Sequence, residues 1–111
     1  MKLTIERAAL LRSLNHVQSV VERRNTIPIL ANVLLHAEDG SVKLTATDMD
    51  IAIVEAAPAD VHAAGETTAP AHTLYEIVRK LPEGAQIELE AGDDKLVLNA
   101  GRSRFVLAAL P

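Results

Sequence analysis

The sequence predicts an α+β fold in which the order strand, helix, three strands occurs twice, with both helices on one face of antiparallel sheets. Two segments carry apolar residues at helical spacing, most of the remainder alternates apolar and polar residues, and turn sequences separate the alternating runs. The 111 residues suffice for one domain, so we expect residues 1–111 to form a single one. The halves share little sequence identity, so the repeat depends on element order alone.

The first half begins with a strand, in which Leu3 and Ile5 alternate with polar neighbours. Residues 7–21 follow with helical spacing. Their apolar stripe comprises Leu10, Leu14, Val17 and Val21, widened by Leu11, and the opposite face holds Arg12, Asn15, His16 and Ser19. Three strands are expected at 33–37, 42–47 and 51–53, and Glu38-Asp39-Gly40 predicts a hairpin between the first two.

The second half repeats this order. A strand is expected at about 66–69 and a helix over 71–81, preceded by Pro70 and ended by Pro82 with Gly84. The helix places Leu74, Ile77, Val78 and Leu81 inside and His72, Thr73, Glu76, Arg79 and Lys80 outside. Strands at 87–90, 96–98 and 105–107 complete the unit, separated by Gly92-Asp93-Asp94 and the weaker turn signal Ala100-Gly101.

Charge is distributed unevenly. The formal net charge is −4, which at first argues against nucleic acid. The helical segments 7–24 and 70–81 together carry +4, residues 101–111 carry +2, and the remaining residues carry −10. A solvated polar face is the ordinary reason for exposed helical arginines. Two basic helices on one face would nevertheless bind phosphates locally, because charges interact within a Debye length of about 8–10 Å.

Composition and motifs argue against several other functions. The chain has no Cys, and its four His lack ligand spacing, so we expect no metal site or cofactor. Asp48 and Asp50 resemble part of a calcium loop, but the required glycine and later glutamate are missing. No nucleophile elbow or phosphate loop occurs, so we expect no catalytic residue. The only aromatic residues are Tyr75 and Phe105, too few to stack single-stranded bases.

Location follows from equally simple features. No apolar run is long enough to span a membrane, and the first residues lack the apolar core and cleavage site of a signal peptide. We therefore expect a cytoplasmic protein without a membrane partner.

Five segments, in order and at family spacing, resemble the N-terminal domain of the bacterial DNA polymerase III beta subunit family, the replicative sliding clamps. They are residues 1–7 (MKLTIER), 26–35 (TIPILANVLL), 44–50 (LTATDMD), 81–85 (LPEGA) and 101–105 (GRSRF). The resemblance implies a DNA clamp fold and a non-catalytic processivity factor. Two three-domain subunits would form a ring that encircles duplex DNA without sequence specificity, tethers the polymerase and is opened by a clamp loader. Residues 1–111 would then be the first of three domains, and DNA polymerase III and the clamp loader would bind through the others.

The resemblance also implies site residues. Arg24, Arg12 and Arg79 match basic positions that face DNA, and Lys80 adds a neighbouring charge. Relatives often have two basic residues where this chain has His72 and Thr73, and these two positions complete the expected set of DNA-facing residues. The ring-closing edge, which would meet the second subunit, matches Arg102, Arg104, Phe105 and Leu107.

Two alternatives belong to other functional classes. A small protein–protein module would pair through an exposed edge strand such as residues 102–107 and never bind DNA. A hydrolase would require carboxylates that only the fold brings together.

Overall fold

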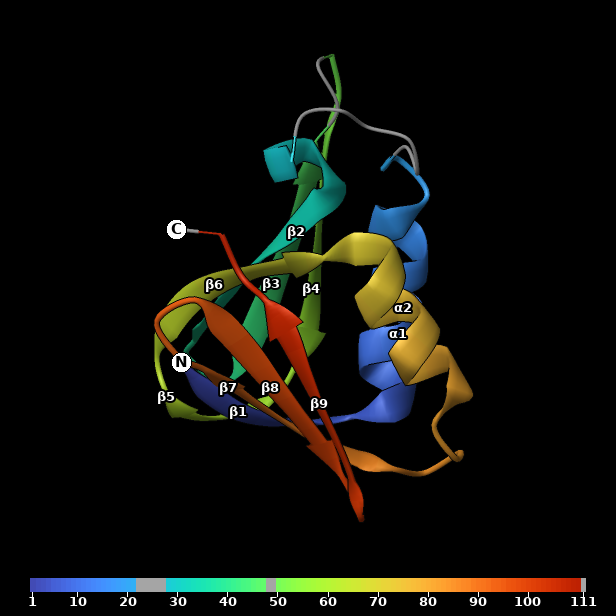
Figure 1. Ribbon diagram of the computed structural model, residues 1–111, viewed down its shortest axis with the longest axis vertical. Coiled ribbons are helices and arrows are strands. Elements are labelled where there is room, and N and C mark those ends of the chain that lie inside the picture. Colours follow the sequence, from blue (N-terminus) through green and yellow to red (C-terminus); the bar gives the residue numbers. More distant parts are fainter. Residues whose placement is uncertain (22–27, 48–49, 111) are drawn as a thin grey trace.

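The computed structural model describes residues 1–21, 28–47 and 50–110. It contains two helices and two antiparallel sheets, which confirms the predicted α+β class (Figure 1). The helices are α1 (Arg7–Gln18) and α2 (Ala71–Lys80), and a short 3-10 helix, η1, spans Pro28–Ala31. The strands are β1 (Lys2–Glu6), β2 (Asn32–Glu38), β3 (Ser41–Thr47), β4 (Ala52–Pro58), β5 (Asp60–Ala63), β6 (Gly65–Pro70), β7 (Gln86–Ala91), β8 (Lys95–Ala100) and β9 (Ser103–Ala108).

The predicted repeat is present, with one additional strand. The first unit comprises β1, α1 and β2 to β4, and the second comprises β6, α2 and β7 to β9. The sequence patterns do not predict β5, which lies between the units. The predicted helix over 7–21 ends at Gln18, and Ser19, Val20 and Val21 continue it only as turns with bonds to the third preceding carbonyl.

Each sheet contains strands from both units. The five-stranded sheet has the order β5-β1-β7-β8-β9, and the four-stranded sheet has the order β4-β3-β2-β6. The units therefore exchange their first strands, since β1 joins the strands of the second unit and β6 those of the first. This exchange connects the two halves through backbone hydrogen bonds.

The turns form where the sequence predicts them. Asp39 and Gly40 join β2 to β3 with φ values of 51° and 76°, the two positive angles of a type I′ hairpin. Gly101 and Arg102 join β8 to β9, and Gly101 has a φ of 57°, as the first central residue of a type II′ turn requires.

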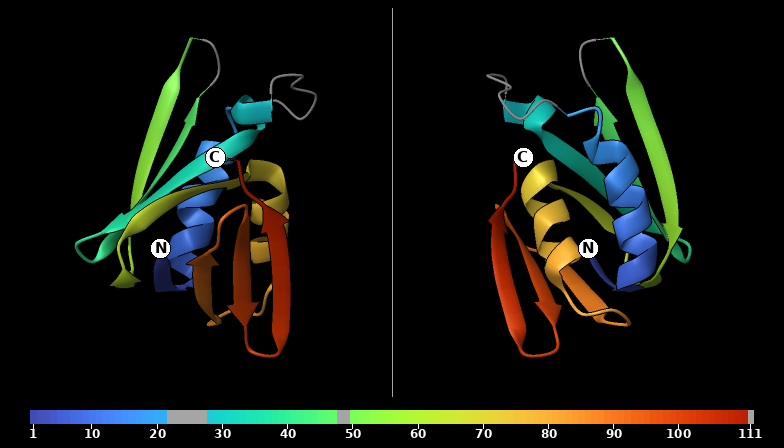
Figure 2. Two further views of the ribbon diagram at one scale, coloured as in Figure 1. Left: turned by 60° about the vertical axis from the view of Figure 1, so that its left-hand side comes forward. Right: turned by 90° about the vertical axis from the view of Figure 1, so that its right-hand side faces the viewer.

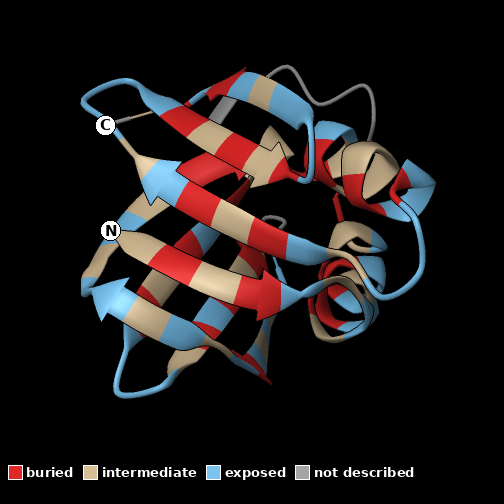
Figure 3. Ribbon diagram, turned by 90° about the horizontal axis from the view of Figure 1, so that it is seen from below, coloured by how far each residue is buried: buried red, intermediate tan, exposed pale blue. Residues whose placement is uncertain are grey.

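The core lies between the sheets and beneath the helices. Alternate residues of every long strand face it, so buried and exposed bands alternate along the ribbons (Figure 3). Cross-strand pairs such as Leu3 with Leu89 and Leu35 with Leu44 are fully buried. The helices close one side of this core with Leu10, Leu14, Val17, Leu74 and Val78, all 0% exposed.

Candidate nucleic-acid interface

Helices α1 and α2 pack side by side on the same side of the molecule (Figures 1 and 2). They run antiparallel, because the start of each contacts the end of the other. The outer stripe of α1 exposes Arg12, Asn15 and His16, as the sequence predicts. At the end of α2, Arg79 and Lys80 are also exposed. The structure thus brings the predicted basic residues Arg12, Arg79 and Lys80 to one helical layer.

Polar contacts tie the two helices together at both ends. Arg7 donates from Nε to the Val78 carbonyl at 3.1 Å and from Nη2 to the Arg79 carbonyl at 2.9 Å. These carbonyls belong to the last turn of α2, where intrahelical donors are lacking and positive charge is favoured. Arg7 is therefore occupied in joining the helices.

His72 makes the corresponding connection at the other end. Its Nε2 donates to the Val21 carbonyl at 2.6 Å, and its Nδ1 lies 2.9 Å from Gln18 Oε1. The side chain is half-buried between the helices. The structure thus gives His72 a role in fixing the helix pair, and its side chain is less exposed than the sequence pattern predicts.

Arg79 has an acidic neighbour on its own helix. Its Nη2 donates to Glu76 Oε2 at 2.7 Å, one turn earlier in α2. The hydrogen bond that Arg79 donates to Glu76, and then the negative charge of Glu76, raise the pKa of Arg79 above its ordinary value. The pair therefore favours the charged form of the guanidinium and gives it an acidic partner one helical turn away.

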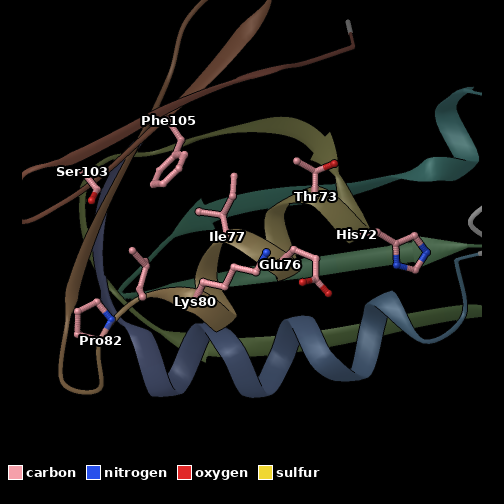
Figure 4. Close-up of a pocket in the computed structure, with 9 residues that line it drawn as sticks. His72, Thr73, Glu76, Ile77, Lys80, Pro82, Ser103 and Phe105 are labelled. Carbon is pink, nitrogen blue, oxygen red and sulfur yellow. The ribbon is translucent and has the colours of Figure 1, made fainter.

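Thr73 and Lys80 line a groove of about 530 Å³ between α2 and the first half of β9 (Figure 4). Glu76, Ile77, Pro82, Ser103 and Phe105 also line it. The sequence places Ile77 in the core, whereas the structure leaves it half-buried at the groove wall. The helical period could not separate these environments, because Ile77 lies at the boundary of the buried stripe.

Strand β9 forms one edge of the five-stranded sheet and pairs only with β8 among the described strands. Arg104 and Val106 point outward, and Val106 is 54% exposed. Phe105 is half-buried and faces the groove, while Leu107 faces the core with 5% exposed. Arg102 lies in the turn before β9. The four predicted edge residues therefore occupy four different environments, and only Leu107 belongs to the core.

Some predicted residues lie outside the described part of the chain. Arg24 belongs to residues 22–27 and Asp48 to residues 48–49, and both ranges lie outside the described residues. Within residues 1–21, 28–47 and 50–110, no group of three or more His, Cys, Asp or Glu could hold a metal ion. No helix of that described part is long and apolar enough to cross a membrane.

Comparisons with known proteins agree with this geometry. The family model for the DNA polymerase III beta subunit, N-terminal domain, matches residues 1–111. The beta sliding clamp of Caulobacter vibrioides is 63% identical over 113 residues, which cover 100% of this chain and 30% of that protein. The beta sliding clamp of Escherichia coli K12 is 42% identical over 112 residues, covering 100% of this chain and 31% of that protein.

Solved structures give the same result. Caulobacter crescentus pol III beta matches with a TM-score of 0.97 at 62% identity, covering 100% of this chain and 30% of that one. The DNA polymerase III subunit beta of Pseudomonas aeruginosa matches with a TM-score of 0.96 at 44% identity and the same coverage. The chain spans about 30% of the length of these relatives. It belongs to the DNA polymerase III beta subunit family and has the fold of that family's N-terminal domain.

Proposed function

We propose that this chain is the first of three similar domains of a ring-shaped sliding clamp that encircles duplex DNA. The exposed cations Arg12, Arg79 and Lys80 on the paired helices are the observation that carries the proposal. Exposed acids such as Glu66 and Glu90 lie on the strands instead. A helical layer with this charge attracts phosphates, while the acidic sheets repel DNA that approaches from outside.

The proposed grip suits sliding. Arginine and lysine side chains bind phosphates without reading the base sequence, and long exposed side chains exchange phosphates one at a time. The layer offers no ring platform of the kind that stacks unpaired bases, since Tyr75 is half-buried and Phe105 belongs to the groove. In this proposal the domain is a non-catalytic, DNA-encircling part of a cytoplasmic replication complex. DNA polymerase III and the clamp loader would bind domains beyond residues 1–111.

The groove beside β9 supports a second subunit as the ring-closing partner. In the first unit, α1 packs against β4, and His16 lies 3.3 Å from Glu55. In the second unit, the groove separates α2 from β9, and Ile77 and Phe105 form apolar walls that none of the described elements covers. An edge strand with free backbone groups and an adjacent apolar groove accepts a strand and an apolar side chain from a partner.

Salt-dependent DNA binding by the full-length clamp tests the proposal. Replacing Arg12 and Arg79 with glutamine should weaken binding and reduce the slope of log K against log salt by about 1.8, because each phosphate contact contributes about 0.9. The matched control replaces Lys43 and Lys95, which lie on strands, with glutamine. Equal losses in both variants would mean that only net charge matters and would refute the helical interface.

The alternative, an edge-strand module without DNA binding, has specific support from the open β9 edge. The same titration decides it, since such a module would bind DNA equally poorly before and after both changes. Replacing Ile77 and Phe105 with alanine should shift the clamp from dimer to monomer in sedimentation. An unchanged dimer would refute the assignment of the groove to ring closure.

A further inference from the structure

Glu76 is the only acidic residue in α1 and α2, both of which the structure describes completely. The two helices carry four basic residues, Arg7, Arg12, Arg79 and Lys80. Arg7 is bound to carbonyls at the end of α2, which leaves three cations for a ligand. The single carboxylate is placed against one of them, at 2.7 Å from Arg79.

The geometry of this pair favours Glu76 as a restraint on Arg79. Glutamate three residues before arginine is the favourable order on a helix, because it also suits the helix dipole. The Arg79 side chain is 51% exposed and borders solvent, whereas Glu76 is 34% exposed and also lines the groove beside β9. A phosphate that binds Arg79 must therefore share the guanidinium with Glu76 or displace the carboxylate.

We infer that Glu76 is a positioning residue. It orients Arg79 for binding to a phosphate, and it also weakens the binding of Arg79 to duplex DNA. This inference rests on the proposed function. Displacement of the carboxylate costs part of the binding energy at each phosphate, and release restores the pair. When Arg79 releases one phosphate, it therefore pairs with Glu76 before it binds the next. This lowers the free-energy cost of releasing each phosphate.

The test measures equilibrium binding of the full-length clamp to a fluorescently labelled duplex, at several salt concentrations between about 50 and 200 mM. We expect Glu76→Gln to tighten binding about two- to fivefold at the lowest salt and to steepen the salt slope, since the carboxylate no longer competes. Glu90→Gln is the matched control, because it removes the same charge from an exposed position on β7. It should leave affinity and slope unchanged.

A double-mutant cycle separates positioning from a general charge effect. If Glu76 acts through Arg79, Glu76→Gln should give little gain in a chain that already carries Arg79→Gln. A gain that persists without Arg79 would overturn the inference, as would identical binding by the Glu76→Gln and Glu90→Gln variants. If the Arg12 and Arg79 double variant also binds DNA normally, the proposed function itself fails, so the two failures are distinguishable.

Discussion

The contact between Arg7 and the end of α2 predicts a measurable loss of stability when the guanidinium is removed. Arg7→Met keeps most of the aliphatic side chain but loses the bonds to the Val78 and Arg79 carbonyls. The first bond is partly buried and the second is exposed, so we assign about 1.5 kcal/mol to the two together. Loss of a cation beside the helix C-terminus adds about 0.5 kcal/mol.

The expected total is about 2 kcal/mol. For 111 residues, whose unfolding entropy is about 2.1 cal/mol/K per residue, this lowers Tm by about 9 °C. Urea unfolding should show a lower midpoint with an unchanged m-value, since the same surface is exposed. Arg7→Lys keeps the charge without the two-pronged geometry and should lose about half as much.

Arg12→Met provides the matched control, because Arg12 lies on the exposed stripe of the same helix. We expect it to change stability by less than about 0.5 kcal/mol. If Arg7→Met is no more damaging than Arg12→Met, the connection between the helix ends does not stabilise the fold, and the reasoning is refuted.

Three further predictions concern other parts of the fold. A hydrogen bond to Glu66, with Glu38 contributing, raises the pKa of His36 above its ordinary value of 6.5. The interaction of protonated His36 with these glutamates should therefore stabilise the folded state below pH 6.5. This contribution should be lost as the pH rises through the pKa of His36 in the folded state. NMR titration should show the pKa falling in Glu66→Gln, and an unchanged titration would contradict the assignment. Thr68 accepts from the Leu110 amide at 2.7 Å, so Thr68→Val should remove that amide's protection from hydrogen exchange while Thr68→Ser retains it. Equal exchange in the two variants would exclude this anchor. Leu107→Ala should cost about 2–4 kcal/mol because the side chain is buried, whereas Phe105→Ala should cost less and act mainly on association. Comparable losses of stability would contradict the different environments of these two residues.

Local patterns predict the helices and most strands because burial repeats with the period of each element. Leu10, Leu14 and Val17 mark the inner face of α1, and all three are fully buried. Strand β5 lacks such a signal, since only Val61 among its four residues is partly buried. Its place in the sheet comes from pairing with β1, a partner more than fifty residues away in sequence.

The exchange of first strands could not be predicted from the same patterns. Alternation shows which face of a strand is buried, but it does not specify the neighbour. Leu3 and Ile5 would bury equally well beside any strand with a similar apolar face. Their pairing with Leu89 and Ile87 follows from the three-dimensional packing of the two units.

Within the candidate site, the sequence predicts the exposure of the basic residues but not the contacts of His72. Arg12, Arg79 and Lys80 lie on polar stripes, and the structure exposes all three. His72 also lies on the polar stripe of its helix, yet it reaches Val21, 51 residues earlier. No spacing within α2 carries information about that partner, so the connection between the helix ends had no sequence signal.

The two connections fix α2 beside α1, and the groove lies on the other flank of α2. Arg7 holds the end of α2 toward α1, and His72 holds its start toward the end of α1. The first unit differs because β4 presents the small, buried Ala57 and the half-buried Ile53 beneath α1, which allows close packing. In the second unit, Ile77 and Phe105 instead face each other across the groove, and this is the space in which we propose that the second subunit binds.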